Sequence, residues 1–179
     1  MIFSLIFSIS VSMLFFISGI SKMLSLKQSA SSIVKLELLP KKLATIIGFS
    51  LPFLEIVMSL ALLLKGNSII INIAMIGLIV VLIIINFRAI NEGKQSDCFC
   101  LGKIVNTKIG YGGLIQCILL LLSLIPNIIN ESINFLEIQE MQLLQIIFIF
   151  ITAFLWVVSM IIIRKLIEIT YNTTGDIEP

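Results

Sequence analysis

The stretch SIIINIAMIGLIVVLIIINF, residues 68–87, decides the fold of this chain. It contains no charged residue and only three strongly polar ones, Ser68, Asn72 and Asn86. An α-helix rises about 1.5 Å per residue, so a stretch of this length reaches across the ~30 Å hydrocarbon core of a bilayer. The stretch therefore predicts a transmembrane helix.

Four further apolar stretches are long enough to cross a membrane with a modest tilt. They are residues 2–20, 43–64, 109–125 and 143–163. Across the 179 residues, 59% are hydrophobic, 12% are charged and the mean hydropathy is +1.17, values that exclude an ordinary soluble domain. We predict an all-α integral membrane protein in which five transmembrane helices form one bundle.

The chain divides into a bundle region, residues 1–125, and a C-terminal region, residues 126–179, which holds an acidic loop, the fifth helix and a polar tail. The first apolar stretch lacks the positive N-terminal region and the A-x-A-like cleavage site of a secretory signal. Lys22 and Lys27 follow it instead. We therefore interpret the first stretch as a retained transmembrane helix.

Basic residues gather on one side of the predicted bundle. With five spans, the first connector, the 88–108 loop and the C-terminal tail lie on the same side, and they hold eleven of the twelve Lys and Arg residues. Because basic loops tend to stay in the cytosol, this distribution predicts a cytosolic 88–108 loop. We expect a multi-pass protein of the cell membrane, in a bacterial plasma membrane, with the lipid bilayer as its surroundings. The sequence contains no recognisable nucleic-acid-binding module.

Small and polar residues within the spans recur at helical spacing, and we expect them to face protein, because acyl chains offer them no favourable contact. Four stripes follow this pattern: Ser4, Ser8 and Ser12; Gly48, Pro52, Glu55 and Ser59; Gly112, Gln116 and Ser123; and Thr152, Trp156 and Ser159. Close packing of small residues explains such spacing without a ligand. We interpret the stripes as contacts between helices.

The polar loop between the third and fourth spans contains Asp97-Cys98-Phe99-Cys100-Leu101-Gly102, in which two thiols stand two positions apart. Extended residues at that spacing have Cα atoms up to ~6.6–7 Å apart, near the upper limit for a disulfide, so a bridge requires some backbone bending. A strained and exposed disulfide is readily exchanged. Lys94 and Lys103 favour a thiolate and Asp97 opposes one, so charge does not decide which thiol attacks first.

Three interpretations of Cys98 and Cys100 are open: a redox pair, two incidental or lipid-modified cysteines, and a soft-metal site. The chain has no histidine, which removes the commonest general base and the usual zinc ligand. Two thiolates alone leave a coordination sphere incomplete, so we expect no metal and no cofactor. The third cysteine, Cys117, falls inside the fourth span, where we expect it to be a small buried hydrophobe.

Two charged residues lie at or within the first two spans. Glu55 falls near the middle of the second span, where an ionised carboxylate is costly, so it should be protonated, hydrogen-bonded or paired. Such carboxylates are candidates for function. Lys22 ends the first span, and its long side chain reaches either a partner or the lipid headgroups, for which we favour headgroup anchoring.

Four short pieces of the sequence stand at the expected helix ends or in a loop. They are Phe15-Phe16-Ile17-Ser18-Gly19-Ile20-Ser21-Lys22, Leu38-Leu39-Pro40, Leu51-Pro52-Phe53-Leu54-Glu55 and Cys98-Phe99-Cys100-Leu101-Gly102. In this order they resemble the MauE family of the DoxX-like membrane proteins. The resemblance covers residues 1–124 and leaves the fifth span outside, and Leu101 replaces the family's usual phenylalanine.

The resemblance implies a four-helix transmembrane bundle that assists maturation of the disulfide-rich small subunit of methylamine dehydrogenase, alongside a thioredoxin-like partner. The family's Cys-x-Cys falls on Cys98 and Cys100, its glycine-lysine helix end on Gly19 and Lys22, and its intramembrane glutamate on Glu55. The resemblance also implies that the cysteines face the oxidising outer side. This is the opposite of the facing that the basic residues predict.

We therefore expect a membrane redox accessory protein in which Cys98 and Cys100 exchange disulfides or electrons with a thioredoxin-like protein or an exported client. Lys22 and Glu55 would support this thiol-disulfide exchange by shaping the bundle or relaying protons. The alternative is a non-enzymatic membrane protein, a small-solute carrier or an immunity factor, that works through Glu55. The two hypotheses differ in whether activity depends on the thiols or on the carboxylate.

Overall fold

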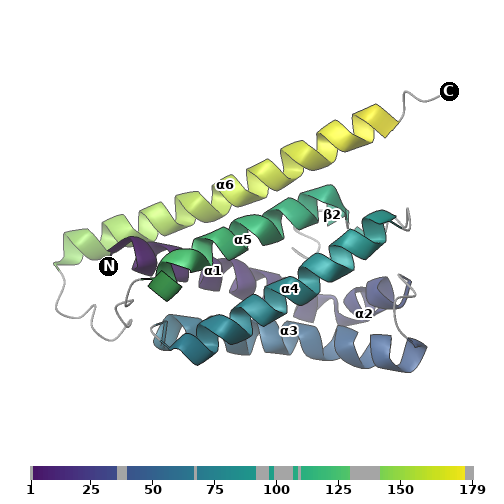
Figure 1. Cartoon of the computed structure of the whole chain (residues 1–179), viewed down its shortest axis with the longest axis horizontal. Helices are drawn as coiled ribbons and strands as arrows, with labels where there is room; N and C mark the ends of the chain where they lie inside the picture. The colour runs from purple at the N-terminus through teal and green to yellow at the C-terminus, as the bar shows by residue number, and fades with distance from the viewer. Residues whose placement is uncertain are drawn as a thin grey trace.

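A computed structural model describes residues 2–35, 40–66, 68–91, 97–98, 107–108, 110–129 and 142–175. Six α-helices and two short strands occupy these residues (Figure 1). The helices are α1 (Ile2–Leu24), α2 (Leu26–Lys35), α3 (Lys41–Leu64), α4 (Ile69–Asn91), α5 (Tyr111–Ile129) and α6 (Leu143–Gly175). The strands β1 (Asp97–Cys98) and β2 (Thr107–Lys108) pair antiparallel.

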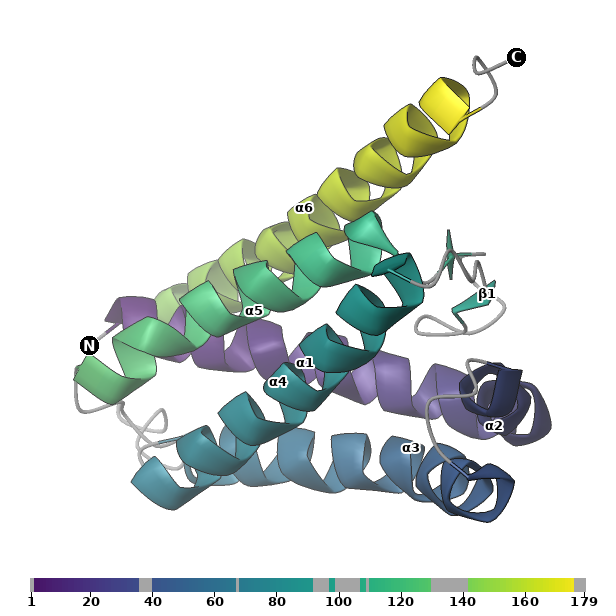
Figure 2. The same cartoon turned by 45° about the vertical axis from the view of Figure 1, so that its right-hand side comes forward.

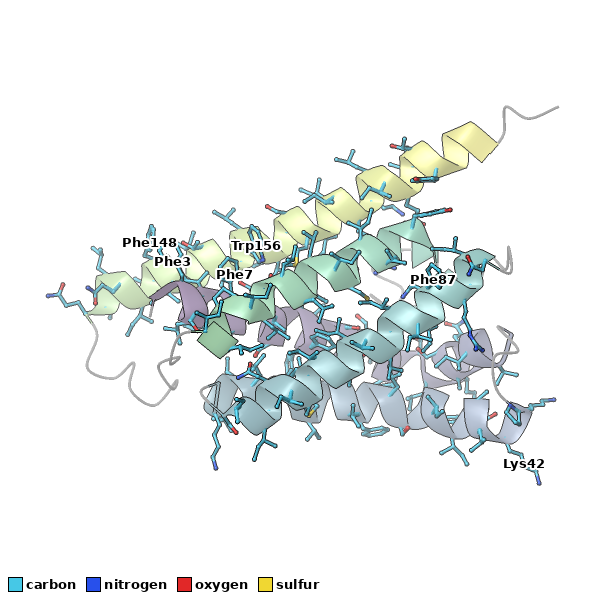
Figure 3. All side chains as sticks on the ribbon, in the orientation of Figure 1. Phe3, Phe7, Lys42, Phe87, Phe148 and Trp156 are labelled. Carbon is cyan, nitrogen blue, oxygen red and sulfur yellow. The ribbon has the colours of Figure 1, made fainter. Side chains whose placement is uncertain are left out.

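Five helices, α1, α3, α4, α5 and α6, are long and apolar enough to cross a membrane. This confirms the prediction of an all-helical membrane bundle with five transmembrane helices. Large apolar side chains point outward along the bundle, as Phe3, Phe87 and Phe148 show in Figure 3, with 75%, 54% and 63% of their surface exposed. Water would penalise so much apolar surface, whereas the acyl chains of a bilayer cover it.

The helices extend beyond several predicted spans, and the added turns begin with good helix formers such as Ala89 in α4 and Lys165 in α6. Helix α4 passes Phe87 and ends at Asn91, and α6 passes Ile163 and ends at Gly175. The polar tail predicted from Arg164 is therefore helical over most of its length. An ion pair between Lys165 and Glu168, 3.5 Å apart on adjacent turns, supports this extension.

Helix α1 lies at the centre of the bundle. It contacts α3, α5 and α6, and 67% of its membrane-spanning window is buried, against 22% for α6. Figure 2 shows α3 and α6 on opposite sides of α1, with α4 and α5 crossing in front. Val11 and Phe15 of α1 belong to the main apolar core, together with Ile79 of α4 and Leu124 of α5.

The predicted stripes on three helices are confirmed as buried faces. Their members are Ser4, Ser8 and Ser12 on α1, Gly48, Pro52, Glu55 and Ser59 on α3, and Gly112, Gln116 and Ser123 on α5. One contact joins α1 directly to α5, since the Ser4 hydroxyl donates to Asn127 Oδ1. Small residues thus let the helix backbones approach closely, as the spacing predicts.

The stripe predicted on α6 is confirmed only at Trp156, and it is wrong at Ser159, which is exposed. Helix α6 buries Ile149, Ala153, Val157, Met160 and Arg164, whereas Ser159 is exposed. Thr152 and Ser159 donate their hydroxyls to carbonyls one turn earlier in the same helix, at 2.8 Å each, so neither needs a partner on another helix. Trp156 keeps a contact across the interface, donating its indole N–H to Ser123 Oγ at 3.1 Å and meeting Phe7 edge-on (Figure 3).

Helix α2 lies in the first connector, which the sequence marks only as rich in lysine. It packs against α3 where Gly48 meets Ala30. A Cβ built on Gly48 would lie 2.6 Å from the Cα of Ala30, a separation that packed atoms do not reach. Glycine is therefore required for this close approach of the two helices.

We expect Gly48→Ala to destabilise the protein, because the new Cβ would force α2 away from α3. Overpacking of this kind costs about 1–3 kcal/mol, measurable as the free energy of unfolding in mixed micelles containing SDS. Gly77→Ala is the matched control, since a Cβ at Gly77 meets nothing within 4 Å and the exchange should be neutral or slightly stabilising. Equal unfolding free energies for the two variants would contradict a tight α2–α3 contact.

Candidate functional site

An ion pair between Lys22 of α1 and Glu55 of α3 lies inside the bundle. Lys22 is 6% exposed and Glu55 is fully buried. The Lys22 Nζ donates to Glu55 Oε1, and the Ser18 hydroxyl donates to Glu55 Oε2 at 3.1 Å. The expectation that Glu55 is paired is confirmed, and the interpretation of Lys22 as a headgroup anchor is wrong, because its amine turns inward.

A close crossing of α1 and α3 makes this ion pair possible. A Cβ built on Gly19 would lie 3.0 Å from the carbonyl oxygen of Pro52 and 2.6 Å from a side-chain carbon of Ile56. Gly19 therefore allows the two backbones to meet beside Glu55. Ser18 and Lys22 stand four residues apart on α1, so both face the same carboxylate.

A second buried cation comes from α6. Arg164 is 3% exposed, and its Nη1 donates to the side-chain oxygen of Gln116 on α5. Its Nε and Nη2 have no hydrogen-bond partner among the described residues. Gly112 allows this approach, since a Cβ there would lie 3.0 Å from the carbonyl oxygen of Arg164.

Sequence reasoning missed Arg164, which it assigned to the start of the polar tail. The signal that points to it is Gln116, an amide within the fourth span that needs a polar partner in an apolar environment. The only basic residues near the end of the fifth span are Arg164 and Lys165. Matching Gln116 to one of these two would have identified the contact.

Asn86, near the end of α4, adds an amide to the same region. Its nitrogen donates to the carbonyl of Leu82 at 2.8 Å, while its side-chain oxygen, Oδ1, has no hydrogen-bond partner in the part of the chain that the structure describes. A Cβ built on Gly113 would lie 2.3 Å from this oxygen, so glycine leaves the space that Asn86 occupies. Cys117, one turn further along α5, is a buried free thiol, in agreement with the prediction.

These groups line one small cavity, which we call the polar cavity. Its volume is about 40 Å³, room for a few water molecules. All five transmembrane helices contribute to its lining: Leu14, Phe15, Ser18 and Lys22 from α1; Glu55 from α3; Leu82 and Asn86 from α4; Gly113, Gln116, Cys117 and Leu120 from α5; and Arg164 from α6. The lining therefore carries two basic side chains and one carboxylate.

The cysteine loop, residues 92–110, connects α4 and α5, two of the helices that line the polar cavity. It leaves α4 at Asn91, five residues after Asn86, and the chain re-enters helix α5 at Tyr111, two residues before Gly113. Within the loop, Cys98 pairs with Thr107 between β1 and β2. Strand β1 contacts α2 and strand β2 contacts α6. Cys100, Phe99, Leu101 and Gly102 lie outside the described residues, so the proposed pair stays a prediction.

Aromatic stacking fixes the start of α5 against the far part of α6. The rings of Tyr111 and Tyr171 lie 4.3 Å apart and nearly parallel, at 10°. Tyr111 is the first residue of α5, directly after the cysteine loop. The loop therefore returns to the bundle beside α6, at the same end as Arg164.

A bundle of five membrane-crossing helices around a buried ion pair defines a multi-pass membrane protein with an intramembrane polar site. The chain matches the family model described as methylamine utilisation protein MauE over residues 1–128, so it belongs to the MauE family. The matched part holds Lys22, Glu55 and the cysteine loop, and it ends before α6 and Arg164. Neither the curated proteins nor the solved structures gave a match to the chain.

We expect Glu55→Gln to be strongly destabilising, because it leaves the Lys22 charge buried without its counterion. Breaking a buried ion pair costs about 3–5 kcal/mol, whereas removing both charges is often nearly neutral. The double variant Lys22→Met/Glu55→Gln should therefore recover most of the loss in unfolding free energy.

Lys42→Met controls for the general effect of losing a lysine, since Lys42 is exposed at the end of α3 (Figure 3). We expect it to change the unfolding free energy by less than about 0.5 kcal/mol. If the two single losses at Lys22 and Glu55 simply added in the double variant, the pair would not be coupled.

Proposed function

We propose that the protein is a membrane redox accessory protein that exchanges disulfides through Cys98 and Cys100. The exchange partner is a thioredoxin-like protein or an exported or membrane-associated client, as in the maturation of methylamine dehydrogenase. Membership of the MauE family, whose model is named for methylamine utilisation, supports this assignment. So does the Cys-x-Cys spacing, which favours a strained and exchangeable disulfide.

The observation that carries the proposal is the attachment of the cysteine loop to the bundle. Both ends of the loop continue into helices that line the polar cavity, and the pairing of Cys98 with Thr107 holds one cysteine backbone against β2. Contacts of β1 with α2 and of β2 with α6 place this pairing at one end of the bundle. We expect a soluble partner to reach the thiols of this loop at the membrane surface.

The exchange step balances without a cofactor. A thiolate of the Cys98/Cys100 dithiol attacks the partner's disulfide and forms a mixed disulfide, releasing one partner thiolate. The second thiol of the pair then attacks the mixed disulfide, which closes the Cys98–Cys100 bond and releases the partner as a dithiol. Two electrons and two protons pass to the partner in total, and the reverse sequence oxidises a client.

Lys22 and Glu55 have a supporting role in this proposal. Their ion pair fixes α1 against α3, and both helices contribute side chains to the lining of the polar cavity. The cysteine loop connects α4 and α5, which line the same cavity. The rival hypothesis assigns the work to Glu55 itself, in a solute carrier or an immunity factor. Full burial of Glu55 beside a cavity inside the membrane is the observation that favours this rival.

We expect two of the three thiols to be oxidised in living cells. After acid trapping, denaturation and alkylation with a polyethylene glycol maleimide, a gel shift should count one free thiol without reduction and three after reduction. The Cys117→Ser variant should count zero and two, because its remaining thiols form the pair. The Cys98→Ser/Cys100→Ser variant should count one in both states and should lose client oxidation.

Single variants identify the attacking thiol. Cys98→Ser or Cys100→Ser leaves a mixed disulfide that cannot be resolved, so one of the two should accumulate a partner-linked species on a non-reducing gel. A pair that is never oxidised, together with full activity of the double serine variant, would refute the proposal. Retained activity of the double serine variant combined with inactive Lys22→Met/Glu55→Gln would support the rival.

A membrane-impermeant charged maleimide, applied to intact and permeabilised cells after reduction, assigns the side on which the loop lies. Labelling in intact cells means that the loop faces outward, as the family resemblance implies. Labelling only after permeabilisation means that it faces the cytosol, as the basic residues predict. The Cys117→Ser background keeps the buried thiol from contributing.

A further inference from the structure

The guanidinium of Arg164 is a buried charged group with unsatisfied hydrogen-bond donors. Only 3% of the residue is exposed. Its Nη1 donates to Gln116, but Nε and Nη2 lack a hydrogen-bond partner in the described part of the chain. Nε and Nη2 share one edge of the planar guanidinium. This edge is the fork that binds a carboxylate through two parallel hydrogen bonds.

The charges that line the polar cavity also favour an anionic ligand. Its lining includes Lys22, Arg164 and one carboxylate, Glu55, which is already engaged by Lys22 and Ser18. Arginine stays protonated in proteins, and burying a charge is costly. Among the residues that line the cavity, positive charges outnumber negative charges by one.

The nearest acidic residue along α6 acts on Arg164 through its charge, but it makes no hydrogen bond to Nε or Nη2. This residue, Glu168, lies one turn after Arg164, and its carboxylate is 3.5 Å from the amine of Lys165. Water can satisfy the hydrogen bonds of the free edge of Arg164, but it adds no negative charge to the cavity. An anion satisfies both requirements.

The size of the cavity restricts the anion. A volume of about 40 Å³ has room for roughly three water-sized groups, which suits the three heavy atoms of a carboxylate group better than the five of a phosphate or a sulfate. The lining also includes the apolar side chains of Leu14, Phe15, Leu82 and Leu120. Apolar groups of this kind suit the carbon chain that follows a carboxylate.

We propose that the polar cavity binds a monocarboxylate, held by the Nε and Nη2 edge of Arg164. Lys22 contributes a second positive charge to the lining. The part of the chain that matches the MauE family supplies Lys22, and α6, which lies outside the match, supplies Arg164. The carboxylate comes either from a small acid dissolved in water or from a fatty acid in the membrane. This site does not depend on the proposed thiol exchange.

The test measures thermal unfolding of the full-length protein in a neutral detergent, followed by the fluorescence of Trp156, the single tryptophan. Trp156 reports on the interface of α5 and α6, because it is bonded to Ser123. Sodium acetate and sodium decanoate are the two probes, with sodium chloride and decanol as controls for salt and for the acyl chain. Binding should raise the unfolding temperature in a saturable way with a carboxylate but not with the controls.

Variants assign the effect to the cavity. Arg164→Gln should abolish the carboxylate-dependent rise, and Arg164→Lys, which keeps the charge but not the two-point fork, should weaken the apparent affinity by about tenfold or more. Lys165→Gln is the matched control, since it removes an adjacent positive charge whose side chain is 41% exposed, and it should respond as the natural protein does. If Arg164→Gln does not fold, the comparison of Arg164→Lys with Lys165→Gln carries the test.

Saturation by acetate would identify a water-soluble acid, and saturation by decanoate alone would identify a fatty acid. A natural protein that responds to neither carboxylate would overturn the proposal. An equal response in folded Arg164→Gln, or an equal response of Arg164→Lys and Lys165→Gln, would also overturn it. A response to chloride as strong as that to acetate would show that the cavity does not select carboxylates.

Discussion

The ion pair between Lys22 and Glu55 is the constraint on which the arrangement of the bundle depends. In hydrocarbon, either charge alone would be costly, so α1 and α3 must meet where the two side chains reach each other. Gly19 makes that approach sterically possible, and Ser18 satisfies the second carboxylate oxygen. Because α1 also contacts α5 and α6, fixing it against α3 sets the positions of the remaining helices.

All five transmembrane helices meet around polar atoms at the polar cavity. Its two cations have different origins. Lys22 belongs to the region that defines the family, whereas Arg164 belongs to the additional helix. The added helix thus changes the charge inside the site while leaving the ion pair of the family bundle in place. Helix α6 therefore adds a buried charged group to the bundle as well as packing against α1 and α5.

Much of this architecture follows from patterns in the sequence. Hydropathy alone predicted the five transmembrane helices, and four-residue spacing predicted the buried faces of α1, α3 and α5. The need of a buried carboxylate for a partner predicted that Glu55 is paired. The wrong face on α6 has a physical cause, since the hydroxyls of Thr152 and Ser159 are satisfied within their own helix and place no demand on packing.

Two cations escaped prediction for a related reason. Lys22 and Arg164 both stand at the end of an apolar run, where a long basic side chain reaches headgroups and the interior equally well. Tertiary packing decides between these two directions, and the local sequence does not show which packing will form. Contact with Gln116 and Glu55 turns both side chains inward.

The length of α6 has a structural consequence. At about 1.5 Å per residue its 33 residues extend ~50 Å, well beyond a hydrocarbon layer of ~30 Å, and its C-terminal end projects past the neighbouring helix α5 (Figure 1). Arg164 lies eleven residues before the last residue of this helix, so about 16 Å of regular helix follows the buried guanidinium. The projecting end and the residue that lines the polar cavity therefore belong to one unbroken element of secondary structure.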